Sequence, residues 1–211
     1  MNLITIDFET FYDTGYGLNR LTTEEYIKSP MFQVIGLSIK INDGKTKWHT
    51  GTQEELQDVL NTIAWDDAAL VCHNMMFDGA ILSWVFNIVP KVYFDTLCIA
   101  RALHGTNAGG SLKALTERYN LGQKGTEVVD AKGLRLEDFP EHQLRQYGEY
   151  CKNDTELTYS LFNIIIKDFP PSELKLIDLT IRMFTQPLIH VDDALLLERL
   201  DEVKKEKEGL L

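Results

Sequence analysis

The sequence has few cysteines, no long apolar run and fewer basic than acidic residues. Its three cysteines, Cys72, Cys98 and Cys151, stand far apart among 211 residues, and none belongs to a Cys-x-x-Cys pair. This usage favours buried thiols in a reducing cytoplasm over a disulfide framework or a zinc site. No stretch reaches about 18 uncharged apolar residues, so we expect no membrane-spanning helix. The amino terminus also lacks the basic and apolar regions of a secretory signal.

The charge balance limits how the chain would bind nucleic acid. Lys and Arg number 21 against 32 Asp and Glu, which gives a formal net charge of −11. Duplex binding relies on Lys and Arg contacts to phosphates, so this acidic excess argues against tight binding by the chain alone. It remains compatible with an enzyme whose carboxylates hold divalent cations.

Strand and helix patterns alternate along most of the chain, and 44% of the residues are apolar, enough for a full core. The predicted strands are residues 2–10, 33–41, 45–50, 69–74 and 91–97. The predicted helices are residues 52–63, 96–104, 111–119, 140–167 and one that starts near Asp78. This order predicts an α/β fold, a mixed five-stranded sheet flanked by helices, with the site at strand-end loops.

The character changes after Pro171, where two helical patterns, 171–186 and 192–211, follow without strands. The last pattern stops at Leu211 without a breaker, so we expect the natural polypeptide to continue. We therefore predict a domain over residues 1–168 and a helical segment over 169–211 that leads toward a further domain.

The first predicted strand ends in two carboxylates, Asp7 and Glu9, separated by Phe8. Strand side chains alternate between faces, so both acids share one face and Phe8 points into the core. Such a pair is unfavourable to desolvate, which raises the question of what neutralises it.

Two further acids follow in positions that suit a shared site. Asp78 lies in the first turn of a helix, four residues after Asn74, and Asp154 lies four residues after Tyr150 on one helical face. Four carboxylates offer the oxygen ligands that Mg²⁺ and Mn²⁺ prefer. Two such ions about 4 Å apart can activate a water for phosphodiester hydrolysis.

Each motif alone is weak. Asp-x-Glu occurs again at Asp154–Glu156, a strand-end or helix-start acid can simply cap the backbone, and Tyr150 fits an ordinary core position. Asn-x-x-x-Asp and Tyr-x-x-x-Asp each occur only once, however. Their joint occurrence in this order favours a metal site.

The stretches "DFET", "HNMMFD" and "YCKND" resemble the three motifs of the DEDD superfamily of 3′–5′ exonucleases, which implies a ribonuclease H-like fold over residues 1–168. The histidine branch would need His in place of Glu149, whereas the tyrosine branch needs Tyr at position 150. The chain therefore resembles the tyrosine subtype.

The surrounding sequence resembles the proofreading domain of family A, polymerase I-like DNA polymerases, through "FDTLCIARAL", "SLKALTERYNLG" and "YCKNDTELTYSLF". The stretch "KGLRLEDF" is most similar to bacteriophage members, and residues 173–200 are similar to the lead-in to the polymerase domain. The resemblance implies a polymerase domain in the same polypeptide, a monomer, and a place in the cytoplasm, that of the bacterial host if the chain is phage-encoded.

By this resemblance, Asp7, Glu9 and Asp154 would ligate one of two Mg²⁺ or Mn²⁺ ions. Asp7 would bridge to the second ion, which Asp78 would hold partly through water. Tyr150 would orient the attacking water, and each cycle would release a nucleoside 5′-monophosphate from the 3′ end of single-stranded or frayed DNA.

Three residues match family positions that line the single-stranded 3′ end: Thr10, Asn74 and Phe77. An aromatic ring at Phe77 would stack on a base, although burial explains it equally well. We expect His73 to be a structural hydrogen-bonding residue, and Cys151 to be a core residue that points away from the site.

Two alternatives remain open from the sequence. The chain would be an RNA-trimming exonuclease of the same superfamily if it degraded RNA as readily as DNA, because the acids do not read the sugar. It would be a non-catalytic scaffold or strand-binding module if the site had decayed. Retention of all four carboxylates and Tyr150 argues against the scaffold.

Overall fold

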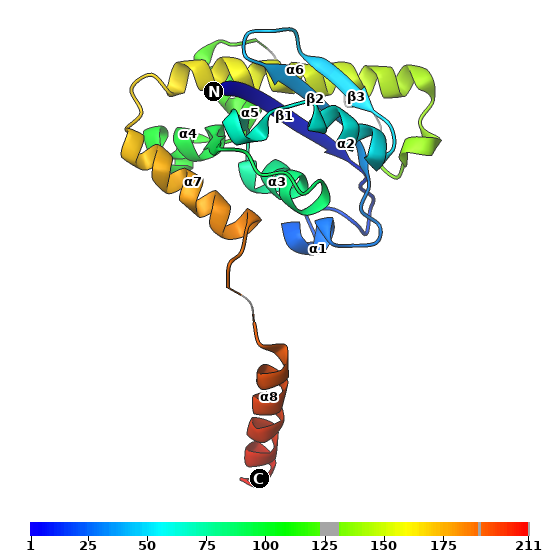
Figure 1. Ribbon diagram of the computed structural model, residues 1–211, viewed down its shortest axis with the longest axis vertical. Helices are drawn as coiled ribbons and strands as arrows, with labels where there is room; N and C mark the ends of the chain where they lie inside the picture. Colours follow the sequence, from blue (N-terminus) through cyan, green and yellow to red (C-terminus); the bar gives the residue numbers. More distant parts are fainter. Residues whose placement is uncertain (123–130, 190, 211) are drawn as a thin grey trace.

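The computed structural model describes residues 1–122, 131–189 and 191–210, so His190 and Leu211 of the predicted segment 169–211 lie outside it. Within the described residues, five strands form one mixed sheet in the order β3-β2-β1-β4-β5 (Figure 1). β1 is central, antiparallel to β2 and parallel to β4. The strands are β1 (Asn2–Thr10), β2 (Val34–Ile41), β3 (Lys47–Thr50), β4 (Ala68–Cys72) and β5 (Val92–Asp95). The predicted mixed five-stranded sheet is confirmed.

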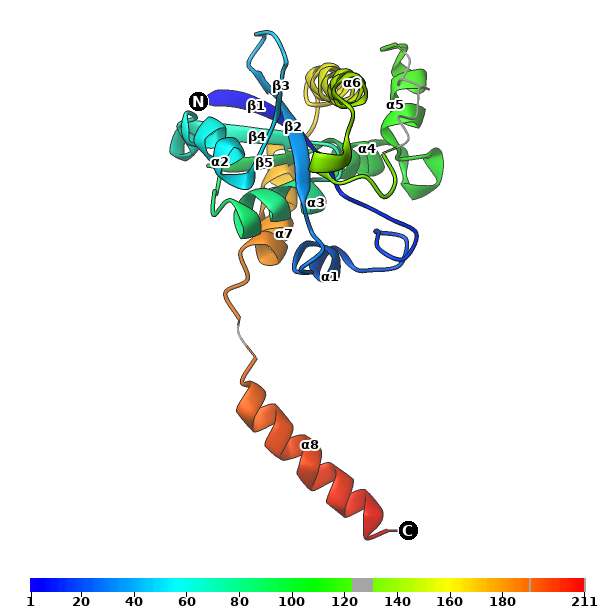
Figure 2. The same ribbon diagram turned by 90° about the vertical axis from the view of Figure 1, so that its right-hand side faces the viewer.

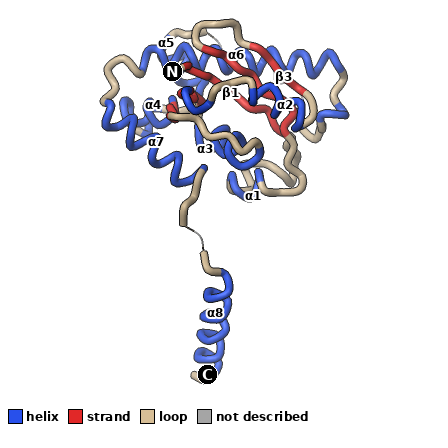
Figure 3. Tube along the Cα trace, in the orientation of Figure 1, coloured by secondary structure: helices blue, strands red, loops and turns tan. Residues whose placement is uncertain are grey.

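Helices enclose this sheet, as the blue and red segments of Figure 3 show. The α-helices of the described ranges are α1 (Thr23–Ile27), α2 (Gln53–Asn61), α3 (Met75–Ala80), α4 (Thr96–His104), α5 (Leu112–Tyr119), α6 (Glu141–Ile165), α7 (Pro171–Thr185) and α8 (Asp193–Glu208). A π-helical turn, Ile81–Val85, continues α3. α6 lies along one face of the sheet with α4 and α5 beside it, and α2 and α3 lie on the other side (Figure 2). None of the helices described is long and apolar enough to cross a membrane.

Several helix starts follow from local capping. Thr52 and Glu55 form the predicted capping box of α2, and Ser111 caps α5 as expected. The predicted helix start near Asp78 is confirmed: α3 begins at Met75, directly after Asn74, so Asp78 lies in its first turn. Asn74 adopts a left-handed backbone with φ 71°. The short helix α1 was not predicted from the sequence, although Thr22 caps it through a capping box with Glu25.

The alternation of β1 divides the core in two. Ile4, Ile6 and Phe8 are buried in one cluster, together with side chains from α2 and α3, and the Phe8 ring stacks on Phe86. The predicted core position of Phe8 is therefore confirmed. A second cluster is formed on the other face of the sheet by side chains of α4, α5 and α6. Because Asp7 and Glu9 alternate with Phe8, they face α6.

The C-terminal helices differ in how they meet the sheet. α7 packs on α3 and β5, where Asp178 accepts a hydrogen bond from the Tyr93 backbone N–H at 2.8 Å and Thr185 O accepts one from Trp84 Nε1 at 2.9 Å. α8 stands away from the sheet in both views (Figures 1 and 2), and all its residues are exposed.

Trp48 of β3 fills the space between the sheet and α6, and two glycines make that space. A Cβ added to Gly36 of β2 would lie 2.4 Å from the indole of Trp48 and 2.6 Å from the backbone oxygen of His49. A Cβ added to Gly148 of α6 would lie 2.6 Å from the same indole. The close approach of α6 to β2 therefore requires glycine on both surfaces.

We expect Gly36→Ala to lower the free energy of unfolding by about 1–3 kcal/mol, because the neighbouring backbone oxygen cannot rotate away. Urea unfolding of the purified variant would measure the change. Gly15→Ala is the matched control, since a Cβ there meets nothing within 4 Å and should change stability by less than about 0.5 kcal/mol. Equal stability of the two variants would contradict this account of the packing.

Candidate active site

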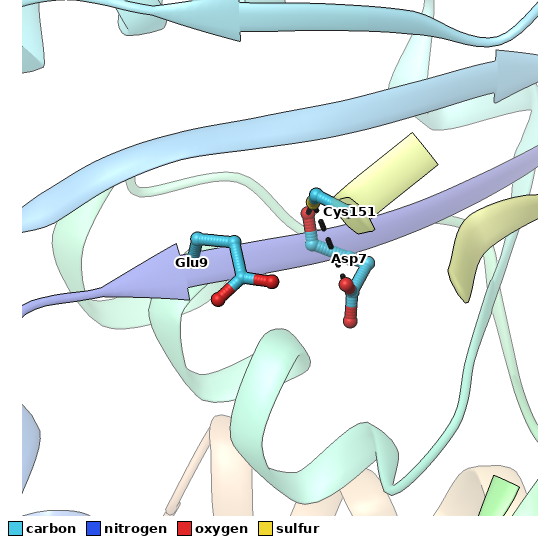
Figure 4. Close-up of side chains that lie close together, drawn as sticks. All are labelled: Asp7, Glu9 and Cys151. Carbon is cyan, nitrogen blue, oxygen red and sulfur yellow. Dashed lines mark hydrogen bonds between the residues drawn. The ribbon is translucent and has the colours of Figure 1, made fainter. Parts of the chain in front are cut away.

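The first two predicted acids lie side by side at the end of the central strand. Asp7 pairs with Ser38 and Glu9 with Gly36 across β2, and the register shifts between Glu9 and Thr10. This bulge bends the end of β1. Figure 4 shows both carboxylates projecting from the strand, with the side chain of Cys151 beside Asp7.

Cys151 is buried, as predicted, but it does not point away from the site. Its Sγ lies 3.3 Å from the Asp7 backbone oxygen, 3.5 Å from Asp7 Oδ2 and 3.3 Å from Ser38 Oγ. Burial, followed by the charges of Asp7 and Glu9, raises the pKa of the thiol well above its ordinary value. The expectation that Cys151 is remote is therefore wrong: it is a neutral thiol in contact with the first acid.

Asp78 reaches the same point from α3. Its Oδ1 accepts a hydrogen bond from the backbone N–H of Phe8 at 3.0 Å, between the two acids of β1. The side chain is buried, and this desolvation, followed by the charge of Asp7, raises the pKa of its carboxyl well above the ordinary value. The structure therefore brings together the first and second predicted motifs.

The left-handed turn at Asn74 positions α3 for this contact. The Asn74 backbone N–H donates to Asp95 Oδ1 at 3.0 Å, and the same oxygen accepts from the Leu97 N–H at 2.9 Å to cap α4. The neighbouring His73 bridges Thr96 Oγ1 at 2.9 Å and Gly110 O at 3.0 Å. His73 is thus a structural hydrogen-bonding residue, as predicted.

The third motif lies on α6, the long helix that packs along β1 and β2. Tyr150 is half-buried and Asp154 is buried, four residues apart on one side of the helix. Asp154 follows Cys151, which contacts Asp7, by about one helical turn. The third motif therefore lies along the central strand that carries the first.

An open cleft of ≈ 640 Å³ lies beside the acids, lined by residues that include Glu9, Thr10, Phe77, Lys132 and Tyr147. Thr10 and Phe77 thus lie in one cleft with Glu9. The Thr10 hydroxyl hydrogen-bonds to the Tyr26 hydroxyl at 2.8 Å, and the Phe77 ring lies 6.0 Å from that of Tyr26. Asn74, an exposed residue, is not part of this lining.

Sequence reasoning missed Tyr147, which is buried on α6 and lines the cleft. Burial, followed by the charge of Glu9 and a hydrogen bond to its carboxylate, raises the pKa of Tyr147 well above its ordinary value. One face of α6 carries Tyr147, Cys151 and Asp154, which are spaced by four and three residues. This helical spacing could have identified Tyr147 and Cys151 as neighbours of the predicted site.

The donor set suits a divalent cation. One carboxylate oxygen each of Asp7 and Glu9 and the sulfur of Cys151 lie within 4.8 Å of one another. Because the thiol is held neutral, the anionic donors here are carboxylate oxygens, which suit Mg²⁺ or Mn²⁺ better than a soft metal. The pKa of Asp78 is raised by its burial and then by the charge of Asp7, and a cation bound here would offset both.

The raised pKa of Asp78 predicts a pH-dependent stability in the absence of metal. Its contribution is fully present below the unfolded pKa of about 4 and is lost as the pH rises through the higher folded pKa. In chelator, Asp78→Asn should therefore exceed the wild type in free energy of unfolding at pH 8, and the difference should shrink toward pH 4.

Urea unfolding at the two pH values would measure this difference. Asp43→Asn, in the exposed turn between β2 and β3, is the control and should show no such gap. If the free energies of unfolding of the wild type and of Asp78→Asn changed in parallel with pH, the fold would not raise the pKa of Asp78, and this account would be wrong.

Comparisons with known proteins agree with this geometry. Residues 24–169 match a family model described as 3′-5′ exonuclease; the match includes Asp78, Tyr150 and Asp154 and begins after β1. DNA polymerase I of Borreliella burgdorferi is 30% identical over 135 residues, which make up 63% of this chain and 14% of that polymerase.

Solved structures with similar folds have lower sequence identity. Brucella melitensis NrnC gives a TM-score of 0.62 at 16% identity over 87% of this chain and 81% of that chain. Trypanosoma brucei RNase D, in complex with RNA U12, gives 0.63 at 17% identity over 91% and 67%. These likenesses show the fold, which is ribonuclease H-like with a helical C-terminal region.

Proposed function

Because the chain belongs to the 3′-5′ exonuclease family, we propose that it hydrolyses DNA from the 3′ end with two divalent metal ions, releasing nucleoside 5′-monophosphates. The observation that carries this proposal is the meeting of Asp7, Glu9 and Asp78 at the end of β1, beside an open cleft. The predicted roles of Tyr150 and Asp154, on the helix that packs along the same strand, complete the site.

The four carboxylates would hold the ions. Asp7, Glu9 and Asp154 would bind one, and Asp7 and Asp78 the other. Bound there, the ions would make the attacking water more acidic and stabilise charge on the phosphate oxygens. Tyr150 would orient that water by a hydrogen bond.

The lining of the cleft favours a single-stranded substrate over a duplex. Thr10 and Phe77 line it beside Glu9, so the terminal nucleotide would lie against them with its phosphodiester near the acids. An aromatic ring can stack on any base, which suits removal of a nucleotide irrespective of its identity. Arg20 and Lys132, also in the lining, would offset part of the repulsion between the phosphates and an acidic chain.

DNA is the preferred substrate in this proposal because the 30% identical relative is a DNA polymerase. The chain spans 14% of that polymerase. We propose that residues 1–168 are a proofreading exonuclease domain and that the segment 169–211 leads toward a polymerase domain. A bacteriophage source, a monomeric state and a cytoplasmic location belong to the same proposal. The second candidate is an exoribonuclease, because a fold neighbour is an RNase D in complex with RNA.

We expect a 5′-labelled single-stranded DNA to be shortened from its 3′ end in Mg²⁺ or Mn²⁺ and to stay intact in chelator. Asp7→Ala should slow this reaction at least about a thousandfold, because it removes several kcal/mol of charge stabilisation. Denaturing gel electrophoresis of time points would measure the metal dependence and the effect of Asp7→Ala. An RNA of the same sequence would be run in parallel.

The outcomes of that assay distinguish the two candidates. Faster shortening of DNA supports proofreading chemistry, and faster shortening of RNA would replace it with the exoribonuclease. No cleavage of either strand by the folded wild type would contradict both. Asp7→Ala should keep the wild-type circular dichroism spectrum, so that its loss of activity is not a loss of fold.

Tyr150→Phe should slow hydrolysis less than Asp7→Ala, by about 10- to 100-fold, because one hydrogen bond to the water is lost while the metal ligands remain. Single-turnover rates at saturating metal would compare the two variants. Equal losses would show that Tyr150 does more than orient the water.

A further inference from the structure

Tyr147 contacts the site but has no role in the reaction proposed above. It lies on α6 one turn before Cys151, only 5% exposed, and lines the same cleft as Glu9. Its hydroxyl hydrogen-bonds to the Glu9 carboxylate. An ionised carboxylate can only accept hydrogen bonds, so the phenol O–H of Tyr147 is the donor in this hydrogen bond.

The ring of Tyr147 is fixed by two aromatic neighbours. It stacks on Phe139 with centroids 5.6 Å apart and an interplanar angle of 13°. On β3, the Trp48 ring lies 6.4 Å away at 58°. Trp48 is itself wedged between Gly36 and Gly148, where an added Cβ would clash with the indole. A side chain packed in this way has little freedom to move its hydroxyl.

The sheet register explains why this contact falls on Glu9. Glu9 pairs with Gly36, which offers no side chain on the face that both residues share. Trp48 covers that glycine, and Tyr147 extends from α6 over the same region to Glu9. Gly36, Trp48 and Tyr147 thus form a continuous support beside the carboxylate.

We propose that Tyr147 is a positioning residue, whose hydroxyl holds the Glu9 carboxylate in the orientation that binds the metal ion. This inference rests on the proposed function. A hydrogen bond to a ligating carboxylate fixes its orientation before the metal arrives, so its loss weakens metal binding. Tyr147 therefore sets metal affinity, whereas Tyr150 acts on the water.

The test is direct Mn²⁺ binding by isothermal titration calorimetry on the full chain. Tyr147→Phe keeps the packed ring and removes only the hydroxyl, and it should weaken Mn²⁺ binding by about 10-fold or more. Its thermal unfolding temperature in chelator should match that of the wild type or exceed it. The matched control is Tyr93→Phe, a buried tyrosine on the edge strand β5 whose hydroxyl accepts a hydrogen bond from Gln186; its Mn²⁺ affinity should stay at the wild-type value.

Hydrolysis kinetics separate the two tyrosines. Tyr147→Phe should raise the Mg²⁺ concentration for half-maximal rate, and its deficit should shrink as Mg²⁺ is raised. Tyr150→Phe should lower the rate at saturating Mg²⁺ and leave Mn²⁺ affinity unchanged. A constant deficit for Tyr147→Phe at every Mg²⁺ concentration would place it in the chemical step and overturn the proposal.

The binding experiment also distinguishes failure of this inference from failure of the proposed function. Unchanged Mn²⁺ affinity in a folded Tyr147→Phe, with normal binding by the wild type, would overturn the role of Tyr147 alone. Absence of Mn²⁺ binding by the wild type would overturn the metal site itself, and with it the exonuclease mechanism. Equal weakening in Tyr93→Phe would mean that any buried tyrosine has this effect, which also contradicts the proposal.

Discussion

The crowding of carboxylates at the end of β1 is the constraint on which the rest of the site depends. Asp7 and Glu9 share one face of the strand, and the buried carboxyl of Asp78 meets the same strand at Phe8. The raised pKa of Asp78 follows from this burial and from the charge of Asp7. Like charges held together away from water destabilise a fold until protons or cations neutralise them.

Each of these acids receives a neutral donor from a different part of the fold. The Phe8 backbone N–H donates to Asp78, the Cys151 thiol to Asp7 and the Tyr147 phenol to Glu9. Neutral donors orient carboxylates without cancelling their charge. The negative charge of the site therefore remains available to a divalent cation, and the metal ions of the proposed mechanism would stabilise the fold as well as supply the chemistry.

A chain of net charge −11 repels a polyanionic substrate such as a nucleic acid. The cleft beside the acids offsets part of this repulsion. Arg20 and Lys132 lie in its lining with aromatic and hydroxyl side chains. Local cations and apolar rings can hold a few nucleotides where the overall charge repels a long duplex. The terminal single strand of the proposed reaction would fit this arrangement better than a continuous double helix.

Alternation and capping in the sequence determined the sheet, the helix starts at Thr52 and Ser111, and the common face of Asp7 and Glu9, because these patterns depend on neighbours within a few residues. Motif order also identified Asp78 as a partner of the first strand. Only the tertiary structure decided that Cys151 contacts Asp7 and that Tyr147 supports Glu9. Those contacts depend on Trp48 fitting between Gly36 and Gly148, which lie far apart in the sequence. The contact of Asp78 with the Phe8 backbone depends instead on the left-handed backbone of Asn74, after which α3 begins. The helical period places Tyr147, Cys151 and Asp154 on one face of α6, but it does not say which residue of β1 each one contacts. Packing between such distant segments decides those partners, so only the folded chain reveals them.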